Sequence, residues 1–161
     1  MKYFIMVCVI IVATMGCSKS SGTGPEDGRS WTLMSALQTA TGYDPAVAVY
    51  GGVVYVAYSD SANSAKLTVQ KYENGAWSVV GTRGFSSNSA SNVQICVING
   101  IPYVGYSSGS LGATVYKYES SAWSLVGADG FTPGRADNFT MVCEGTTLYV
   151  AFQDAANSNK L

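Results

Sequence analysis

Residues 55–67 read YVAYSDSANSAKL, and residues 149–161 read YVAFQDAANSNKL. A middle copy of the same pattern begins with YVGYSS at residue 103. Three tryptophans keep the same period, because Trp31, Trp77 and Trp123 stand 46 residues apart. Coincidences in one register identify an internal repeat, and a repeat of this length is typical of units that stack on one another.

Each repeat contains four short runs of strand-forming residues. In the first full copy these runs are residues 46–50, 53–59, 67–72 and 77–80. Gly-Gly or Asn-Gly pairs join the runs, as tight hairpins require. The first two runs are apolar on both faces and the third alternates, so we expect burial to fall from the first strand outward. The sequence predicts an all-β fold, a partial β-propeller of about three four-stranded antiparallel blades.

The repeats resemble bacterial extracellular β-propeller repeats of the general form YVAYsD…KY…Ws.vG..GF. The matching segments are KYE at residues 71–73 and 117–119, and WSVVG at 77–81 with WSLVG at 123–127. The resemblance covers nearly all of residues 30–161. It implies the architecture of the chain, but it implies no activity, because the family has no single activity and no catalytic motif to carry over.

The first sixteen residues, MKYFIMVCVIIVATMG, precede Cys17. One basic residue, an apolar run over residues 3–13 and a small residue before a cysteine resemble a bacterial lipoprotein signal peptide. The resemblance implies cleavage before Cys17, lipidation of that cysteine, and attachment to the bacterial cell envelope at the outer membrane or cell surface. The alternative is an ordinary secretory signal with a chance cysteine.

The predicted domain organisation has three parts. They are a signal peptide over residues 1–16, a flexible Gly/Ser-rich tether over 17–29, and blade-like repeats over 30–161, divided into 30–80, 81–126 and an incomplete 127–161. Residues 30–34 supply only the fourth strand of a blade, and residues 139–161 supply two strands and the start of a third. Closed propellers have about four to eight blades. Two interpretations therefore stay open: a fragment of a longer repeat array, or chains that self-assemble through open blade faces.

Composition argues against several functions. The chain has nine basic and ten acidic residues, a net charge of −1 and no His. The basic residues are scattered, so no nucleic acid partner is predicted. Without His, the chain lacks the usual general base and the commonest metal ligand. We predict no catalytic residues, no metal and no cofactor, and we do not expect an enzyme.

Polar residues recur directly after the second strand of the first and third repeats. They are Asp60, Asn63, Asp154 and Asn157, whereas the middle repeat has Ser108 at the first of these positions. One hypothesis is a small polar pocket for a glycan or protein ligand, with aromatic residues beside it. The alternative is that these side chains satisfy the backbone of their own turn.

Two cysteines lie in the repeats, at Cys96 and Cys143. Alignment of the repeats places them on equivalent strands but on opposite faces. Neighbouring propeller blades pack front to back, so these faces can meet. An exported chain permits a disulfide between them, and the alternative is two buried free thiols.

The leading functional hypothesis is a lipid-anchored, exported, propeller-type binding or scaffold module, held at the membrane through lipid on Cys17. The alternatives are a carbohydrate-binding lectin, a fragment of a larger propeller hydrolase or lyase, and a gene remnant without activity. Trp77 and Trp123 could stack on sugars if exposed, but their fixed place in an outer strand favours packing between blades.

Overall fold

A computed structural model describes residues 11–14, 30–33, 37, 41–109 and 111–161. The described residues form β-strands and two short 3-10 turns. Within these ranges no helix is long and apolar enough to cross a membrane. The chain divides into two units, residues 1–39 and residues 40–161.

The first unit contains one antiparallel pair, β1 (Ile11–Thr14) and β2 (Ser30–Leu33). The strand around Trp31 is therefore present as predicted. Its partner differs from the expected one, because β2 pairs with β1 and not with the third strand of a blade. The apolar end of the predicted signal peptide offers that edge. Cys17 lies outside the described residues.

The second unit is a partial β-propeller of three blades. The first blade is an antiparallel sheet of β3 (Gly42–Tyr50), β4 (Val53–Asp60), β5 (Lys66–Glu73) and β6 (Ala76–Val79), in that order. The second blade repeats this order with β7 (Ser91–Ile98), β8 (Ile101–Ser108), β9 (Gly112–Glu119) and β10 (Ala122–Leu125). The third blade has two strands, β11 (Ala136–Glu144) and β12 (Thr147–Asp154). A bridge between Asp154 and Lys160 marks the start of a third strand, as predicted.

The hairpins follow from the local turn chemistry. Gly51-Gly52 joins β3 to β4, and Asn99-Gly100 joins β7 to β8, with all four residues at positive φ. This is the backbone of the two-residue hairpin that the sequence predicted. The 3-10 turns η1 (Ser61–Asn63) and η2 (Ala155–Asn157) follow the second strands of the first and third blades.

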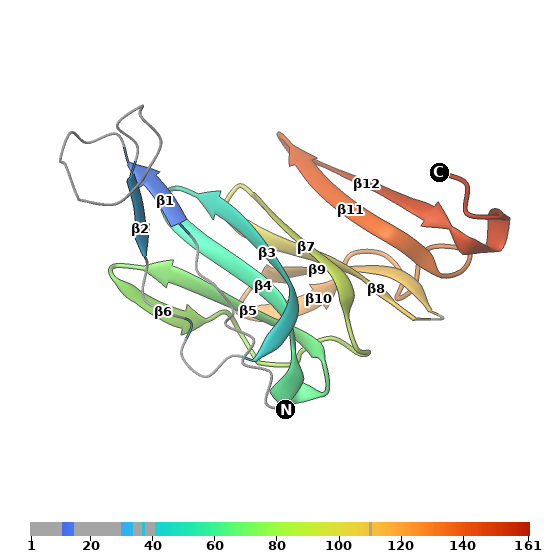
Figure 1. Ribbon diagram of the computed structural model, residues 1–161, viewed down its shortest axis with the longest axis horizontal. Helices are drawn as coiled ribbons and strands as arrows, with labels where there is room; N and C mark the ends of the chain where they lie inside the picture. The colour runs from blue at the N-terminus through green and yellow to red at the C-terminus, as the bar shows by residue number, and fades with distance from the viewer. Residues whose placement is uncertain (1–10, 15–29, 34–36, 38–40, 110) are drawn as a thin grey trace. The chain divides into compact units, whose positions relative to one another are not determined.

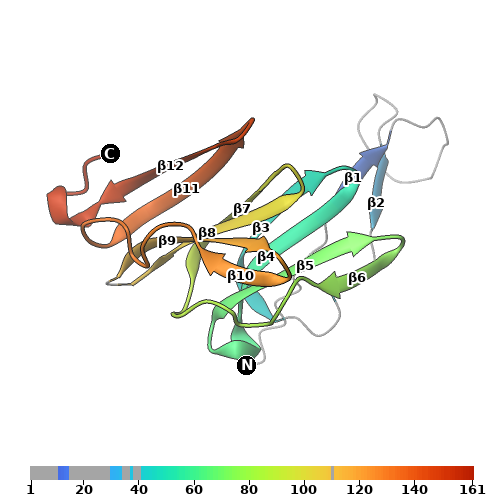
Figure 2. The same cartoon turned by 180° about the vertical axis from the view of Figure 1, so that it is seen from behind.

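The first strands of the three blades lie side by side, with β7 between β3 and β11 (Figure 1). Seen from behind in Figure 2, β6 and β10 are the outermost strands of the two complete blades. Each blade therefore packs one sheet face against the next blade.

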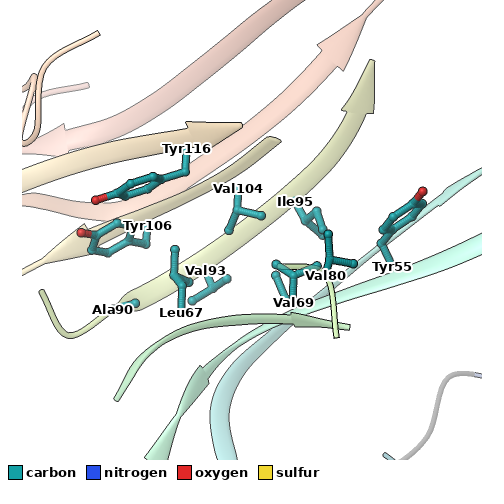
Figure 3. Close-up of a cluster of buried hydrophobic side chains, with 11 residues drawn as sticks. Tyr55, Leu67, Val69, Val80, Ala90, Val93, Ile95, Val104, Tyr106 and Tyr116 are labelled. Atoms are coloured by element: carbon teal, nitrogen blue, oxygen red, sulfur yellow. The ribbon is translucent and has the colours of Figure 1, made fainter. Parts of the chain in front are cut away.

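Apolar side chains from both sheets fill the space between the first and second blades. The first blade contributes Tyr55, Ala57, Leu67 and Val69, and the second contributes Val93, Ile95, Val104, Tyr106 and Tyr116. Figure 3 shows the two sets facing one another, with the rings of Tyr106 and Tyr116 roughly parallel. The second and third blades meet in the same way, through Cys96, Ala113 and Val115 against Ala136, Phe139 and Met141.

Burial does not fall from the first strand outward, so this expectation is wrong for the first blade. In β3, Val47 is 53% and Val49 64% exposed, whereas Leu67 and Val69 of β5 are fully buried. The cause is the position of the blade. The second blade covers one face of β3, but the exposed valines point to the opposite face.

A β-bulge recurs at the same place in the first strand of every blade. The register shifts next to Asp44, Asn92 and Asn138, and each of these residues has φ close to +50°. Asp and Asn tolerate this left-handed conformation better than other residues with side chains. The bulge also joins two blades, because the backbone N–H of Asn92 donates to Asp44 Oδ2 at 2.8 Å.

Candidate functional site

The predicted residue Asp60 forms the centre of a closed corner in the first blade. Its carboxylate is fully buried and accepts hydrogen bonds from the backbone N–H of Ala62 at 3.1 Å and from Asn63 Nδ2 at 2.9 Å. Thr68 Oγ1 on the neighbouring strand donates a third hydrogen bond, at 2.9 Å. These bonds begin the turn η1 and tie it to β5, which is a structural role.

Arg83 adds a positive charge to this corner from the segment that leads to the second blade. Its guanidinium lies 3.5 Å from Asp60 Oδ2 and donates to the hydroxyl of Tyr58 at 3.2 Å. Gln70 Nε2 donates to the same hydroxyl at 2.7 Å. Burial raises the pKa of Tyr58 above its ordinary value, so the hydroxyl stays protonated.

The second blade builds its corner differently. Ser108 stands where the first blade has Asp60, and the carboxylate comes instead from Asp129, which aligns with Arg83 in the repeat. Asp129 accepts from Thr114 Oγ1 at 2.8 Å and from Ser87 Oγ at 2.7 Å. The threonine is thus bound to a carboxylate in both blades. In the first blade the acid lies at the end of a strand, and in the second it lies in the loop after the fourth strand.

This exchange leaves two buried hydroxyls without a hydrogen-bond partner among the described residues. They are Tyr106 Oη and Ser108 Oγ. Tyr106 aligns with Tyr58, whose hydroxyl accepts two hydrogen bonds. Burial also raises the pKa of Tyr106. The polar corner of the second blade is therefore less completely satisfied than that of the first.

The corner of the third blade is more open. Asp154 is half-buried, and its Oδ1 accepts from the backbone N–H of Ala156 at 2.9 Å. Asn157 lies at the end of η2 and is exposed. The four predicted polar residues thus form two separate corners, one in the first blade and one in the third. In both, the aspartate satisfies the backbone of its own turn, as the alternative interpretation proposed.

The tryptophans of the outer strands pack against aromatic neighbours. Trp123 stacks on Phe85 with ring centroids 4.1 Å apart, and its Nε1 donates to the carbonyl of Val80 at 2.9 Å. Phe85 and Val80 precede the second blade, so Trp123 packs between blades as predicted. Trp77 lies 5.2 Å from Tyr72, centroid to centroid.

The two cysteines meet between the second and third blades. Cys96 is buried in the cluster shared by these blades, and Cys143 packs against that cluster. Both are free thiols in the structure. Cys143 Sγ also lies 3.7 Å from the carbonyl oxygen of Val97.

The outermost sheet faces carry exposed apolar side chains. On β3, Val47 and Val49 are exposed, and on the third blade Val142 is 62% and Tyr149 52% exposed. Phe131 is 40% exposed, although its equivalent, Phe85, is covered by Trp123. Among the described residues, no group of three or more His, Cys, Asp or Glu side chains could hold a metal ion.

Sequence reasoning missed three of these features: the bulge, the acid supplied by Asp129, and the orphaned hydroxyls. The bulge had a visible signal, because Asp44, Asn92 and Asn138 occupy the same place in the repeat. The signal for Asp129 was weaker. The second repeat has Asp129 where the first has Arg83, and it has Ser108 where the first has Asp60.

Comparison with known proteins adds little to this description. No protein-family model matches the chain, and no curated protein matches it. Among solved structures, the chain is similar to Zg3597, a family 117 glycoside hydrolase produced by the marine bacterium Zobellia galactanivorans. The two share 13% sequence identity with a TM-score of 0.48, over 83% of this chain and 52% of that chain. The chain thus spans about half the length of that hydrolase, and none of the hydrolase's site residues are assigned to it.

Proposed function

We propose that this chain is a non-catalytic scaffold or binding module whose outer blade faces bind a second copy of the same chain. One observation carries the proposal. The exposed residues of the two outer faces are the repeat equivalents of residues that already pack against each other between the blades.

The strand pairings define this equivalence. Ala48, Cys96 and Val142 occupy one position, because they pair with the tyrosine of the YV motif in their own blades. Val49, Val97 and Cys143 occupy the next position along the same strands. Within the molecule, Cys143 packs against the cluster that contains Cys96.

The same joint would place Val49 of one copy against Val142 of another. Both residues are apolar and more than half exposed. Covering exposed apolar surface of this kind is favourable by about 25 cal/mol per Å². The contact is head to tail, so it either continues from copy to copy or closes into a ring. Two three-bladed copies would bring six blades together, within the range of about four to eight found in closed propellers.

Signal processing fits this proposal. Cleavage before Cys17 would remove β1 and leave the edge of β2 without its partner.

We propose that the mature chain is attached to the bacterial cell envelope by lipid on Cys17. The mass of the mature chain tests this: a diacylglycerol adduct is expected on Cys17 in the natural chain and none in Cys17→Ser. An unmodified Cys17 in the natural chain would contradict it.

The assembly is tested by sedimentation equilibrium of the Cys17→Ser chain over a range of concentrations. We expect a reversible oligomer, and Val49→Glu or Val142→Glu should each abolish it, because either variant places a charge in the joint. Leu125→Glu is the control, since Leu125 is 41% exposed on the outer strand β10. A chain that stays monomeric throughout would overturn the proposal and favour further repeats of a longer polypeptide as the natural occupants of both faces.

Mixing distinguishes a head-to-tail joint from a symmetric one. A Val49→Glu chain keeps an intact third blade, and a Val142→Glu chain keeps an intact first blade. A mixture of the two should therefore form a dimer through the one remaining joint. A mixture that stays monomeric, when the unsubstituted chain assembles, would show that each copy uses the same face.

The lectin alternative receives less support from the geometry. Its candidate residue Asp60 is buried and holds three hydrogen bonds within its own blade. A glycan array tests the alternative directly. Binding that is lost in the Asp60→Ala, Asp154→Ala chain but kept in the Asp137→Ala chain would revive it, because Asp137 pairs with Arg135 on the surface.

A further inference from the structure

The joint between the second and third blades contains two thiols from different sheets. Cys96 lies on β7 and is 7% exposed, and Cys143 lies on β11 and is half-buried. Both side chains belong to the same packed cluster. Because the two residues occupy neighbouring positions of the repeat, one projects from the front face of its blade and the other from the back face of the next.

The two blades approach each other closely at this joint. Packed sheets normally lie about 10 Å apart, which is too far for a disulfide. Along the first strands the blades converge, and β7 and β11 have Cα atoms within 8 Å of one another. Gly105 permits this approach, since a Cβ atom there would lie 2.7 Å from the ring of Phe139. Cys143 Sγ lies 3.7 Å from the carbonyl oxygen of Val97, the residue that follows Cys96.

We propose that Cys96 and Cys143 form a disulfide that links the second blade to the third. The reaction is an exchange with an external small-molecule disulfide. The more exposed Cys143 loses its proton and attacks one sulfur of that disulfide, which releases one thiol. Cys96 then loses its proton and attacks the mixed disulfide at Cys143, which releases the second thiol. The protein loses two hydrogens, and the external disulfide is reduced to two thiols.

The environment assigns different roles to the two residues. Burial, with a further contribution from the Cys143 thiol, raises the pKa of Cys96 to about 12. Cys96 is therefore protonated at neutral pH and a poor first nucleophile. Cys96 is suited to the second step, the attack on the mixed disulfide at Cys143, because that step is intramolecular and the two residues are neighbours.

The link would matter most for the third blade. That blade has two strands, and its other sheet face is exposed at Val142 and Tyr149. A disulfide restricts the unfolded chain and keeps the two blades together when packing alone fails. The inference does not depend on self-assembly, because both cysteines belong to one copy.

The experiment uses the full chain under native conditions. The chain is incubated with oxidised glutathione, quenched with N-ethylmaleimide and digested with trypsin, which cuts between the cysteines after Lys117 and Arg135. We expect a cross-linked pair of peptides containing Cys96 and Cys143, with both residues protected from alkylation. Oxidation should also raise the Tm of the unsubstituted chain but not that of Cys143→Ser.

Two results would overturn the inference. One is a chain in which both thiols remain alkylated after treatment, while the same chain in denaturant becomes oxidised. The other is a cross-link that joins either cysteine only to Cys17 or to a second molecule. Because the peptide map uses the unsubstituted chain, these readouts do not depend on whether a cysteine variant folds.

Discussion

The carboxylate at the blade corner comes from different residues in different blades. In the first blade it is Asp60, with Arg83 beside it, and in the second it is Asp129, with Ser108 at the strand end. Each acid binds the equivalent threonine of its own blade. One acid bound to the threonine is the element common to both corners, so a second acid at the same corner should be unfavourable.

Exchanging both residues of the second corner tests this interpretation. Ser108→Asp alone should destabilise the chain by about 1–3 kcal/mol, because a second carboxylate is buried near Asp129. Asp129→Arg alone should cost a similar amount, since Thr114 and Ser87 lose their acceptor. The double variant reproduces the first blade, and the coupling energy measured by urea unfolding should be favourable by about 1–2 kcal/mol. Additive effects would contradict this account of the corner.

The two equivalent tyrosines should respond differently to removal of their hydroxyls. Tyr58→Phe takes an acceptor from Gln70 and Arg83, and we expect a loss of about 1–2 kcal/mol. Tyr106→Phe removes a buried hydroxyl that has no partner among the described residues, so its effect should be within about 0.5 kcal/mol or stabilising. Chemical denaturation of the two variants side by side provides the comparison. An equal loss in both would show that Tyr106 has a partner.

At this scale the sequence offered two interpretations of Asp60, one of which agrees with its hydrogen bonds, but it gave no interpretation of Asp129. The role of Asp60 depends on a turn three residues long, and an aspartate that binds its own turn is a local property. The role of Asp129 depends on a contact between a loop and Thr114, fifteen residues away. A contact across that separation follows from the folded arrangement and not from local chemistry.

The blade itself is the clearest case of an element specified by sequence. The Gly-Gly and Asn-Gly turns fix the hairpins, and the expected strands agree with the observed ones apart from their ends. The bulge was missed because a period-two pattern does not reveal one extra residue. Its residues are now recognisable: Asp44, Asn92 and Asn138 with positive φ.

The bulge should therefore be sensitive to side-chain type at Asn92. Asn92→Val forces a β-branched residue to a φ of +51°, which should cost about 1–2 kcal/mol. Asn92 Nδ2 also donates a hydrogen bond to Ser107 Oγ, and both Asn92→Val and Asn92→Gly remove it. Glycine adopts a positive φ without strain, so Asn92→Gly is the matched control. Thermal or urea unfolding should place the glycine variant well above the valine variant in stability. Equal stabilities would mean that the bulge relaxes.

At the scale of the whole molecule, the joints between blades depend on close approach of backbone and aromatic rings. Gly81 precedes the second blade and lies beneath Trp123, with no room for a side chain. Its repeat equivalent, Gly127, has a similar positive φ but nothing within 4 Å of its Cβ position. The pair separates the cost of backbone strain from the cost of disturbing the joint.

Alanine at these two glycines should therefore have unequal effects. Gly127→Ala should cost about 1 kcal/mol through its positive φ alone. Gly81→Ala adds a clash, since the new Cβ would lie 2.8 Å from the ring of Tyr118 and 2.8 Å from that of Trp123. We expect a further loss of about 1–3 kcal/mol and a change in Trp fluorescence for Gly81→Ala only. An equal loss of stability in the two variants would show that the joint rearranges to accommodate the new methyl group.

The sequence predicted that neighbouring blades pack face to face, but it did not predict which faces stay exposed. Repeat parity placed the two cysteines on facing sides, and the structure has them together. Two features could not be read from the sequence: which blade faces are exposed, and the pairing of the strand around Trp31 with β1. Both depend on how many repeats are present and on what lies beside them. Those are properties of the assembled fold.

The displaced acid of the second blade also limits how this repeat can be duplicated in a gene. A copy of residues 53–68 contains both the aspartate and the threonine of its corner, so the hydrogen bond between them transfers with it. A copy of residues 101–126 leaves its acid behind, because Asp129 belongs to the segment that leads to the next blade. Expansion of the array by copying the second unit alone would thus insert a blade with an unpaired Thr114. An inserted segment that extends past Asp129 would keep the corner whole.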